Sequence, residues 1–225
     1  MERLDLVLAG ARLTALQSGA LWWEEARLLC VSDLHLGKSE RLARRGGSLL
    51  PPYEVQETLS RLEADIAATD ARSLVCLGDS FDDTAAAEAL PETALAWLTR
   101  LQAGREWFWI AGNHDPAPLT LSGTHLAELR IGHIVFRHIA VPGAEGEISG
   151  HYHPKARLNL GGQRIARPCF LMDRHRLILP AYGTYTGGLW CDSAPLSELF
   201  DADARAILLG RRLHMVPMPG QRLRR

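Results

Sequence analysis

The feature that most restricts the fold is a pattern that recurs five times between residues 28 and 153. Each time, a short apolar run ends in polar residues that can bind a metal ion. The runs, each with the polar residues that follow it, are Leu28–Val31 before Asp33 and His35, Leu74–Leu77 before Asp79, Trp107–Ala111 before Asn113, Ile134–Phe136 before His138, and Glu147–Ser149 before His151 and His153. Runs rich in aliphatic, aromatic and β-branched residues predict buried strands.

Two amphipathic segments between these runs predict helices. In Glu54–Thr69 the apolar residues recur at helical spacing on one face, and Pro91–Leu101 repeats the pattern with a proline that a first turn tolerates. Strands that alternate with helices predict an α/β sheet, in which ligands collect at the carboxyl ends of the strands. We therefore expect the five polar clusters to converge at one rim, although they lie far apart in the sequence.

Beyond His153 the sequence changes character. Short apolar runs alternate there with turn residues such as Asp173-Arg174 and Gly210-Arg211, a pattern that predicts antiparallel strands. The runs are Leu158–Leu160, Phe170–Met172, Leu177–Leu179, Ala206–Leu209 and Leu213–Val216. We expect them to form a second sheet packed on the first, with one helical turn at Ser197–Phe200.

Length and charge limit the remaining possibilities. The chain has 225 residues, of which 47% are hydrophobic, so we expect a single domain over residues 1–225. The formal net charge is −1, so any affinity for nucleic acid must come from a local patch or from the site itself. The first residues show no basic stretch followed by an apolar run, and no segment approaches the ~18 apolar residues of a membrane span, so we expect a cytoplasmic protein without membrane contact. The last arginines, Arg222, Arg224 and Arg225, predict a disordered tail.

The four cysteines are widely spaced and form no CxxC pair. A zinc site or a disulfide is therefore the less favoured interpretation, and buried reduced thiols are the more favoured one. The cysteines are Cys30, Cys76, Cys169 and Cys191.

The polar clusters have the chemistry of a metal site. An Asp-x-His pair after a strand places a carboxylate and an imidazole on the same side of an extended backbone. The carboxylate of Asp79 has two oxygens and can bridge two ions, while Asn113 offers a neutral oxygen. Mixed oxygen and nitrogen donors favour Mn, Fe, Co, Ni or Zn over Mg or Ca.

Each motif is weak alone, but their order is specific. The chain contains Asp-x-His, Gly-Asp-x-x-Asp, Gly-Asn-His-Asp, a separate histidine and Gly-His-x-His, in that order. This ordered set resembles the calcineurin-like metallophosphoesterase superfamily, over more than half of the chain from Asp33 to His153. The resemblance implies an α/β (α+β) fold, a four-layer αββα sandwich with two mixed β-sheets and a dinuclear metal site at the carboxyl-terminal rim of the strands.

The same resemblance implies a role for each matched residue. One metal would take Asp33, His35, Asp79 and His153, and the other would take Asp79, Asn113, His138 and His151. His114 matches the general acid, and Asp115 matches the residue that orients it. His138 is preferred to the nearby His133 because it follows its strand, whereas His133 precedes it. A water activated between the two ions would attack phosphorus, and Mn²⁺ is the favoured ion.

A closer resemblance lies in the flanking segments. They are Leu36-Gly37-Lys38, the arginine-rich stretch through Arg45-Gly46 to Pro51-Pro52, Arg167–Phe170 and Leu179–Gly188. Together they resemble the bacterial ligase-associated DNA-damage-response metallophosphoesterases, the PdeM-type endonucleases, although Tyr182 and Tyr185 stand where phenylalanine is commoner. This resemblance implies phosphodiester hydrolysis in DNA, a role in DNA repair, and a DNA ligase or helicase as partner.

Several alternatives stay open from the sequence alone. Lys38 and Arg45 either contact substrate phosphates or belong to a solvated face. Trp107 and Trp109 are expected in the core rather than stacked on bases. A phosphatase or pyrophosphatase acting on a small molecule or nucleotide would have the same ligands, whereas a non-catalytic scaffold is disfavoured because every matched position is intact. A homodimer is the default expectation for an oligomer.

Overall fold

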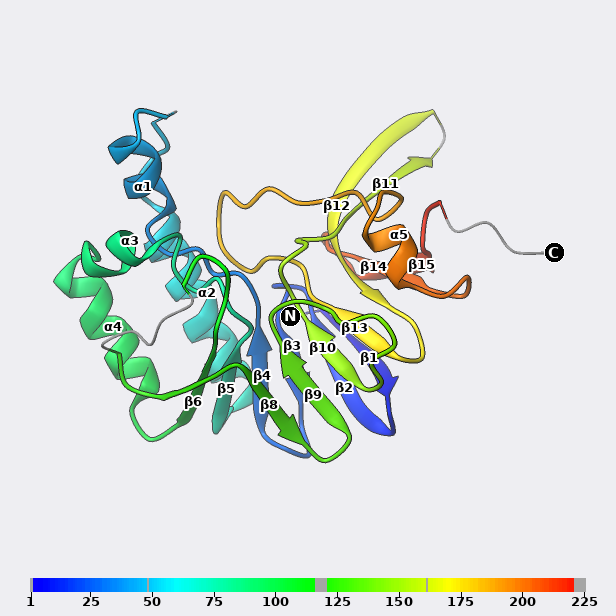
Figure 1. Cartoon of the computed structure of the whole chain (residues 1–225), viewed down its shortest axis with the longest axis horizontal. Helices are drawn as coiled ribbons and strands as arrows, with labels where there is room; N and C mark the ends of the chain where they lie inside the picture. Colours follow the sequence, from blue (N-terminus) through cyan, green and yellow to red (C-terminus); the bar gives the residue numbers. More distant parts are fainter. Residues whose placement is uncertain (1, 48, 116–120, 161, 221–225) are drawn as a thin grey trace.

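The computed structural model describes residues 2–47, 49–115, 121–160 and 162–220. Two β-sheets face each other, with helices on the outer side of the first sheet (Figure 1). The C-terminal arginines, for which a disordered tail was predicted, lie outside the described residues.

The first sheet has seven strands, which lie side by side in the order of the sequence. They are β1 (Arg3–Leu8), β2 (Ala11–Leu16), β3 (Leu21–Trp23), β4 (Leu28–Val31), β5 (Ser73–Cys76), β6 (Glu106–Ile110) and β7 (Thr124–Leu126). The strands β1 to β4 pair antiparallel, and β4 to β7 pair parallel. Because β4, β5 and β6 run in one direction, their carboxyl ends meet at one edge of the sheet.

The helices cover one face of this sheet. They are α1 (Lys38–Arg44), α2 (Glu54–Thr69), α3 (Thr84–Glu88) and α4 (Glu92–Gln102). The predicted helix Glu54–Thr69 is confirmed with the same bounds, and the helix predicted at Pro91–Leu101 starts one residue later because Pro91 is its N-cap. Leu59 and Leu62 pack into a core that includes Leu74 and Trp107, so the amphipathic pattern does mark the buried face.

The second sheet has eight strands, with β11 paired to the edge of β12. They are β8 (Glu128–Ile131), β9 (Ile134–Arg137), β10 (Glu147–Ser149), β11 (Lys155–Leu160), β12 (Gln163–Met172), β13 (Arg176–Ile178), β14 (Arg205–Leu208) and β15 (His214–Pro217). The expectation that all five polar clusters follow strands of one sheet is wrong for two of them. Strands β9 and β10 belong to the second sheet, where they pair parallel with each other.

The two sheets share a buried core. Cys30 and Val75 from the first sheet lie in one cluster with Phe136, Phe170 and Ile207 from the second. On the outer side of the second sheet, a smaller core gathers around the single helical turn α5 (Leu196–Leu199). The αββα arrangement of two mixed sheets between helices is therefore confirmed, and within the described residues the outer layer of the second sheet is the one turn α5.

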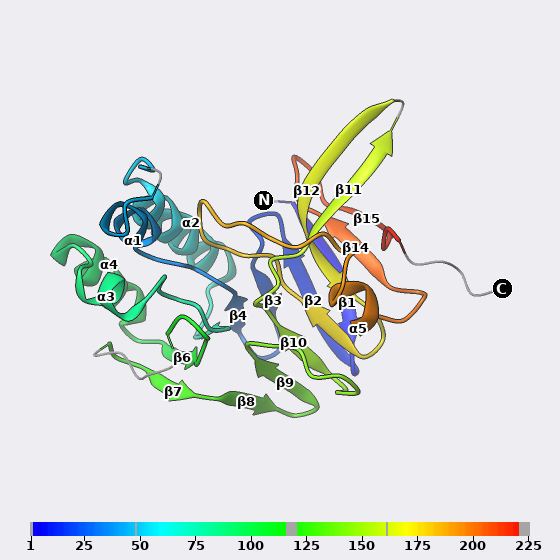
Figure 2. The ribbon, with the colours of Figure 1, turned by 45° about the horizontal axis from the view of Figure 1, so that its top comes forward.

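One hairpin departs from this layered arrangement. Strands β11 and β12 extend together beyond the rest of the ribbon, as Figures 1 and 2 both show. Elsewhere the expected buried thiols are found, since all four cysteines are buried and free. Trp107 and Trp109 are also buried, as expected. No helix in the described part of the chain is long and apolar enough to cross a membrane.

Candidate metal centre

The seven residues expected to bind metal come together where edges of the two sheets meet. Each follows the carboxyl end of a strand. Asp33 and His35 follow β4, Asp79 follows β5, Asn113 follows β6, His138 follows β9, and His151 and His153 follow β10. The rim that was expected from one sheet is thus built from strands of both.

The first group consists of Asp33, His35 and His153, whose donor atoms all lie within 4.8 Å of one another. His153 Nε2 is 3.1 Å from Asp33 Oδ1 and 3.3 Å from His35 Nε2. Two imidazole nitrogens and a carboxylate at this spacing are suited to a shared divalent cation, because the cation satisfies lone pairs that would otherwise face each other.

The second group consists of Asp79, His138 and His151, again within 4.8 Å. His138 Nε2 lies 3.4 Å from Asp79 Oδ2 and 3.2 Å from His151 Nδ1. The amide oxygen of Asn113 is 2.9 Å from the same His138 nitrogen. The predicted neutral oxygen donor therefore lies beside this group.

Asp79 connects the two groups. Its Oδ2 atom is 3.4 Å from His138 Nε2 in the second group and 4.0 Å from His35 Nε2 in the first. A carboxylate between two sets of nitrogen donors has the geometry expected of a bridging ligand, and both donor sets match the mixed oxygen and nitrogen chemistry of a divalent transition-metal pair.

Hydrogen bonds fix which ring nitrogen of His138 and of His35 faces its group. The Nδ1–H of His138 donates to the carbonyl oxygen of Leu77 at 2.7 Å. The Nδ1–H of His35 donates to Asp82 Oδ1, also at 2.7 Å. Because those acceptors require a proton on Nδ1, the lone pair of each neutral ring is on Nε2, which points into the metal centre.

Asp82 was not among the residues expected at the site. Its carboxylate binds His35 and is paired with Lys38 at 3.7 Å and with Arg41. Burial alone would raise its pKa, but the His35 hydrogen bond and the two cations lower the pKa to about 2. The signal was present in the sequence, because Asp82 is the second aspartate of the Gly-Asp-x-x-Asp motif.

Asp82, His35 and His114 also form a group within 4.8 Å. This carboxylate is already engaged by Lys38 and Arg41, so a further cation there would compete with two fixed positive charges. The group is better explained as support for the metal centre than as a third metal site.

His114 stands beside the centre, where two hydrogen bonds hold it. Its backbone N–H donates to Asp79 Oδ1 at 2.9 Å, and its ring Nδ1–H donates to the carbonyl oxygen of Asp82 at 2.7 Å. A carbonyl only accepts hydrogen bonds, so Nδ1 carries a proton and Nε2 is the ring nitrogen left to face a substrate.

The expectation that Asp115 orients His114 is corrected by this geometry. Asp115 Oδ2 instead accepts the backbone N–H groups of Ser80 and Phe81, at 2.7 and 3.2 Å. Its role is to hold the loop that follows Asp79. Burial raises the pKa of Asp115 to about 6, even though these two hydrogen bonds lower it.

The carboxylates and imidazoles of the centre shift one another's pKa values. Burial would raise the pKa values of Asp33 and Asp79, yet hydrogen bonds and charges of the histidines hold both below their ordinary values. Burial lowers the pKa of His151, and the neighbouring His138 lowers it further. His138 has a raised pKa because its contacts with Asp79 and Asp33 outweigh burial.

The backbone of the centre is unusually strained. Five of the proposed ligands adopt a left-handed backbone, with φ between 44° and 70°: Asp33, His35, Asp79, His151 and His153. Such values are uncommon for residues other than glycine, and they persist only where the surrounding structure enforces them. Gly78 is required beside them, since it has φ +77° and a Cβ there would lie 2.5 Å from His138 Nδ1.

The two basic residues expected to contact substrate are engaged by acids. Lys38 lies 3.7 Å from Asp82 Oδ1, and Arg45 Nη2 lies 3.2 Å from Asp83 Oδ2. Arg44 also binds Asp83. The positive charge of α1 is thus largely balanced by neighbouring carboxylates.

Two facing sheets with clustered Asp and His donors at their common edge define the class of metal-dependent hydrolases. A family model described as calcineurin-like phosphoesterase matches residues 26–197. The chain belongs to this family. The match confirms the resemblance to calcineurin-like metallophosphoesterases and the prediction that the protein is a hydrolase.

The solved structures that match the chain include a nuclease and a phosphoesterase. The nuclease MPE of Pseudomonas putida has 28% sequence identity and a TM-score of 0.74, over 95% of this chain and 100% of that one. Yfce, a phosphoesterase from E. coli, has 16% identity and a TM-score of 0.39, over 85% of this chain and 98% of that one. No curated protein gave a significant match.

Proposed function

We propose that the chain is a nuclease that hydrolyses phosphodiester bonds of DNA with two divalent ions. The observation that carries this proposal is the pair of donor groups that share Asp79, with 3.4 and 4.0 Å from its Oδ2 to the nearest histidine nitrogen of each group. The likeness to a nuclease at 28% identity over 95% of the chain supports a nucleic acid as substrate.

Each residue has a role in this proposal. Asp33, His35 and His153 hold one ion, Asn113, His138 and His151 hold the other, and Asp79 binds both. Two bound ions supply an activated water and neutralise charge on the phosphoryl oxygens. His114 donates the proton of its Nε2 to the leaving oxygen.

The ion is proposed to be Mn²⁺. The two groups together offer four imidazoles, two carboxylates and an amide oxygen, a set too rich in nitrogen for Mg²⁺ or Ca²⁺. Four of these donors have their orientation fixed by hydrogen bonds or close packing within the centre, namely Asp33, His35, Asp79 and His138.

The test is a substrate panel with the manganese-loaded protein. We expect cleavage of single-stranded DNA and of a nitrophenyl phosphodiester, with loss of both activities and of both ions in Asp79→Asn. Hydrolysis of a phosphate monoester alone would favour a small-molecule phosphatase instead. Two retained ions per chain in Asp79→Asn, by elemental analysis, would exclude the bridging role.

A further inference from the structure

The projecting β11–β12 hairpin has two chemically different faces. In an antiparallel pair, opposite residues share a face and successive pairs alternate between faces. The pairs Lys155–Pro168, Arg157–Ala166 and Asn159–Arg164 therefore lie on one face, here called the cationic face. The pairs Ala156–Arg167 and Leu158–Ile165 lie on the other, where Ala156 and Leu158 pack on the core around α5.

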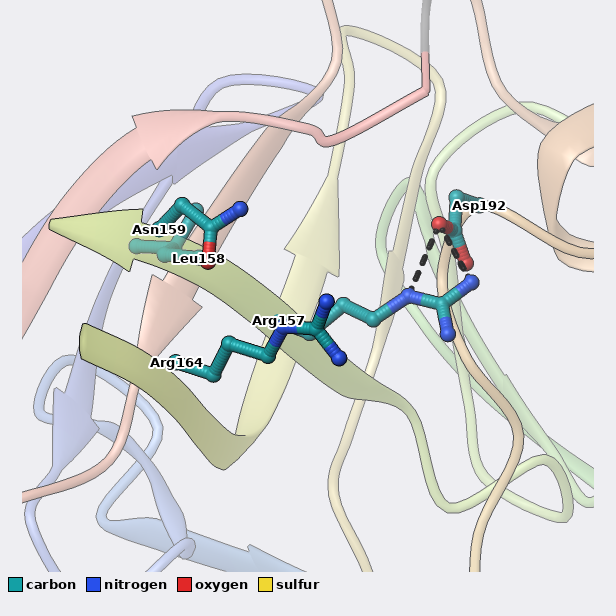
Figure 3. Close-up of a pocket in the computed structure, with 5 residues that line it drawn as sticks. All are labelled: Arg157, Leu158, Asn159, Arg164 and Asp192. Carbon is teal, nitrogen blue, oxygen red and sulfur yellow. Dashed lines mark hydrogen bonds and ion pairs between the residues drawn. The ribbon is translucent and has the colours of Figure 1, made fainter. Parts of the chain in front are cut away.

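The cationic face has little acidic compensation. Arg157 is paired with Asp192 at 3.0 Å and lies over the ring of Trp190 at 5.2 Å. Among the described residues, the side chains of Lys155 and Arg164 have no acidic partner. Figure 3 shows Arg164 and Arg157 extending toward the same side of the hairpin, in a pocket that Asn159 and Asp192 also line. Three cations against one carboxylate leave a net positive surface.

This face begins close to the metal centre. Lys155 begins β11 only two residues after His153, one of the proposed ligands. The segment before Trp190 passes over both, since a Cβ on Gly188 would lie 2.0 Å from the carbonyl oxygen of His153 and 3.1 Å from Lys155 Cε. A polyanion bound at the centre would therefore meet Lys155 first and then Arg157 and Arg164.

The basic residues of α1 are less suited to the same task. Arg44 and Arg45 are paired with Asp83, and Arg41 with Asp82. A phosphate would have to displace these carboxylates, whereas Arg164 can accept one without losing a partner.

We infer that the cationic face of the β11–β12 hairpin binds the phosphate backbone of the DNA strand whose scissile bond lies at the metal centre. This inference rests on the proposed nuclease function and deepens it, because it states where the rest of the substrate lies. The contacts are to phosphates, so they position the strand without reading its sequence.

The dimensions of the hairpin make the inference specific. The six residues of β11 extend about 20 Å at ~3.3 Å per residue. Measured along the axis of a duplex, that length corresponds to about six nucleotides at ~3.4 Å each. A dinucleotide held at the centre is therefore too short to span the hairpin, whereas an oligonucleotide of about twelve nucleotides is longer than the hairpin.

The test compares two charge reversals on opposite faces of one hairpin, Arg164→Glu and Arg167→Glu. Both arginines are exposed in β12, so the two changes are matched in charge and setting. For the long oligonucleotide, Arg164→Glu should lower kcat/KM about tenfold through KM, and the slope of log KM against log salt should fall by about one. Arg167→Glu should have a much smaller effect.

Hydrolysis of the nitrophenyl phosphodiester distinguishes a failure of the hairpin inference from a failure of the nuclease proposal. It should be unchanged in both variants, which also shows that each folds. If wild type cleaves the oligonucleotide and Arg164→Glu matches it at every length and salt concentration, the hairpin inference is wrong and the nuclease proposal stands. Cleavage of the small diester without cleavage of any DNA would overturn the nuclease proposal itself.

Discussion

At the scale of single residues, side chains outside the proposed set of metal ligands determine how the ligands are oriented. Asp82 holds His35 by its carboxylate and His114 by its carbonyl oxygen, so one residue orients a proposed ligand and the proposed proton donor. The carboxylate also fixes the tautomer and the orientation of the His35 ring, which leaves Nε2 to bind a metal ion.

We expect Asp82→Asn to weaken binding of Mn²⁺ about 10- to 100-fold, the usual effect of removing such an outer contact. Asn keeps the shape of the side chain but removes the charge that faces His35, Lys38 and Arg41. The measurement is a calorimetric titration with Mn²⁺. Asp83→Asn is the matched control, because Asp83 caps α3 through Ala86 N at 2.8 Å and asparagine caps equally well. Equal affinities in the two variants would contradict the role of Asp82.

His114→Ala should retain both ions and lose turnover according to the leaving group. On DNA, whose leaving alkoxide needs a proton, we expect a loss of about 10²- to 10⁴-fold. On a nitrophenyl diester the loss should be small, because that leaving group departs unprotonated. The measurement is the ratio of wild-type kcat to variant kcat on each of the two substrates, with the metal content of both proteins measured in parallel. Similar losses on both substrates would exclude proton donation by His114.

The sequence predicted which residue types meet at the centre but not how they are held. The ordered motifs identified the seven donors, since their chemistry is visible in residue names. The resemblance assigned Asp115 as the residue that orients His114, whereas Asp115 Oδ2 accepts the backbone N–H groups of Ser80 and Phe81. The actual partner is a backbone carbonyl of residue 82, and a carbonyl has no signature in a sequence.

At the scale of elements, long amphipathic helices and the apolar runs before the metal-binding motifs were predicted, and several elements without such a motif were not. The 16-residue helix α2 was expected with the observed bounds, since several apolar residues mark its buried face. The short helix α3 and the N-terminal strands β1 and β2 were not expected. In β1 the buried residues Leu6 and Leu8 alternate with exposed ones, but no metal-binding motif follows this strand, and α3 has only five residues.

Tyr182 stands where phenylalanine is commoner in the resembling family, and its contacts with helix α2 explain why a tyrosine fits there. It is fully buried, and its hydroxyl donates to Asp65 Oδ2 of α2 at 2.8 Å. The guanidinium of Arg61 lies 5.0 Å from its ring centre. The tyrosine thereby fastens the segment after β13, which runs beside Asp33, to the outer helix layer.

Tyr182→Phe should lower the free energy of unfolding by about 1–3 kcal/mol, because it leaves a buried carboxyl group without this donor. Burial raises the pKa of Asp65 and the Tyr182 hydroxyl lowers it. The hydroxyl thus favours the ionised carboxylate, so the loss should be larger at neutral pH than below the pKa of Asp65. Denaturant unfolding at both pH values measures it. Tyr185→Phe, at an exposed position, should change stability by less than about 0.5 kcal/mol.

At the scale of the whole molecule, the metal centre is also a junction between the sheets. Asp33, His35, Asp79 and Asn113 follow strands of the first sheet, and the remaining histidines follow strands of the second. The sequence could not show this division, because a strand's apolar run is the same whichever sheet it joins. The pairing of β10 with β9 and β13 depends on contacts between residues far apart in the chain.

An ion bound by donors from both sheets should stabilise the packing of one sheet on the other. At a free Mn²⁺ concentration of 100 times Kd, binding to the native state alone adds about 2.7 kcal/mol per site. We therefore expect Mn²⁺ to raise the thermal midpoint and a chelator to reverse the rise. Asp79→Asn should show no such response, because it removes the carboxylate common to both groups. A midpoint in wild type that does not respond to Mn²⁺ would show that the donors fail to hold ions across the junction, since any ligand that prefers the native state must shift the equilibrium.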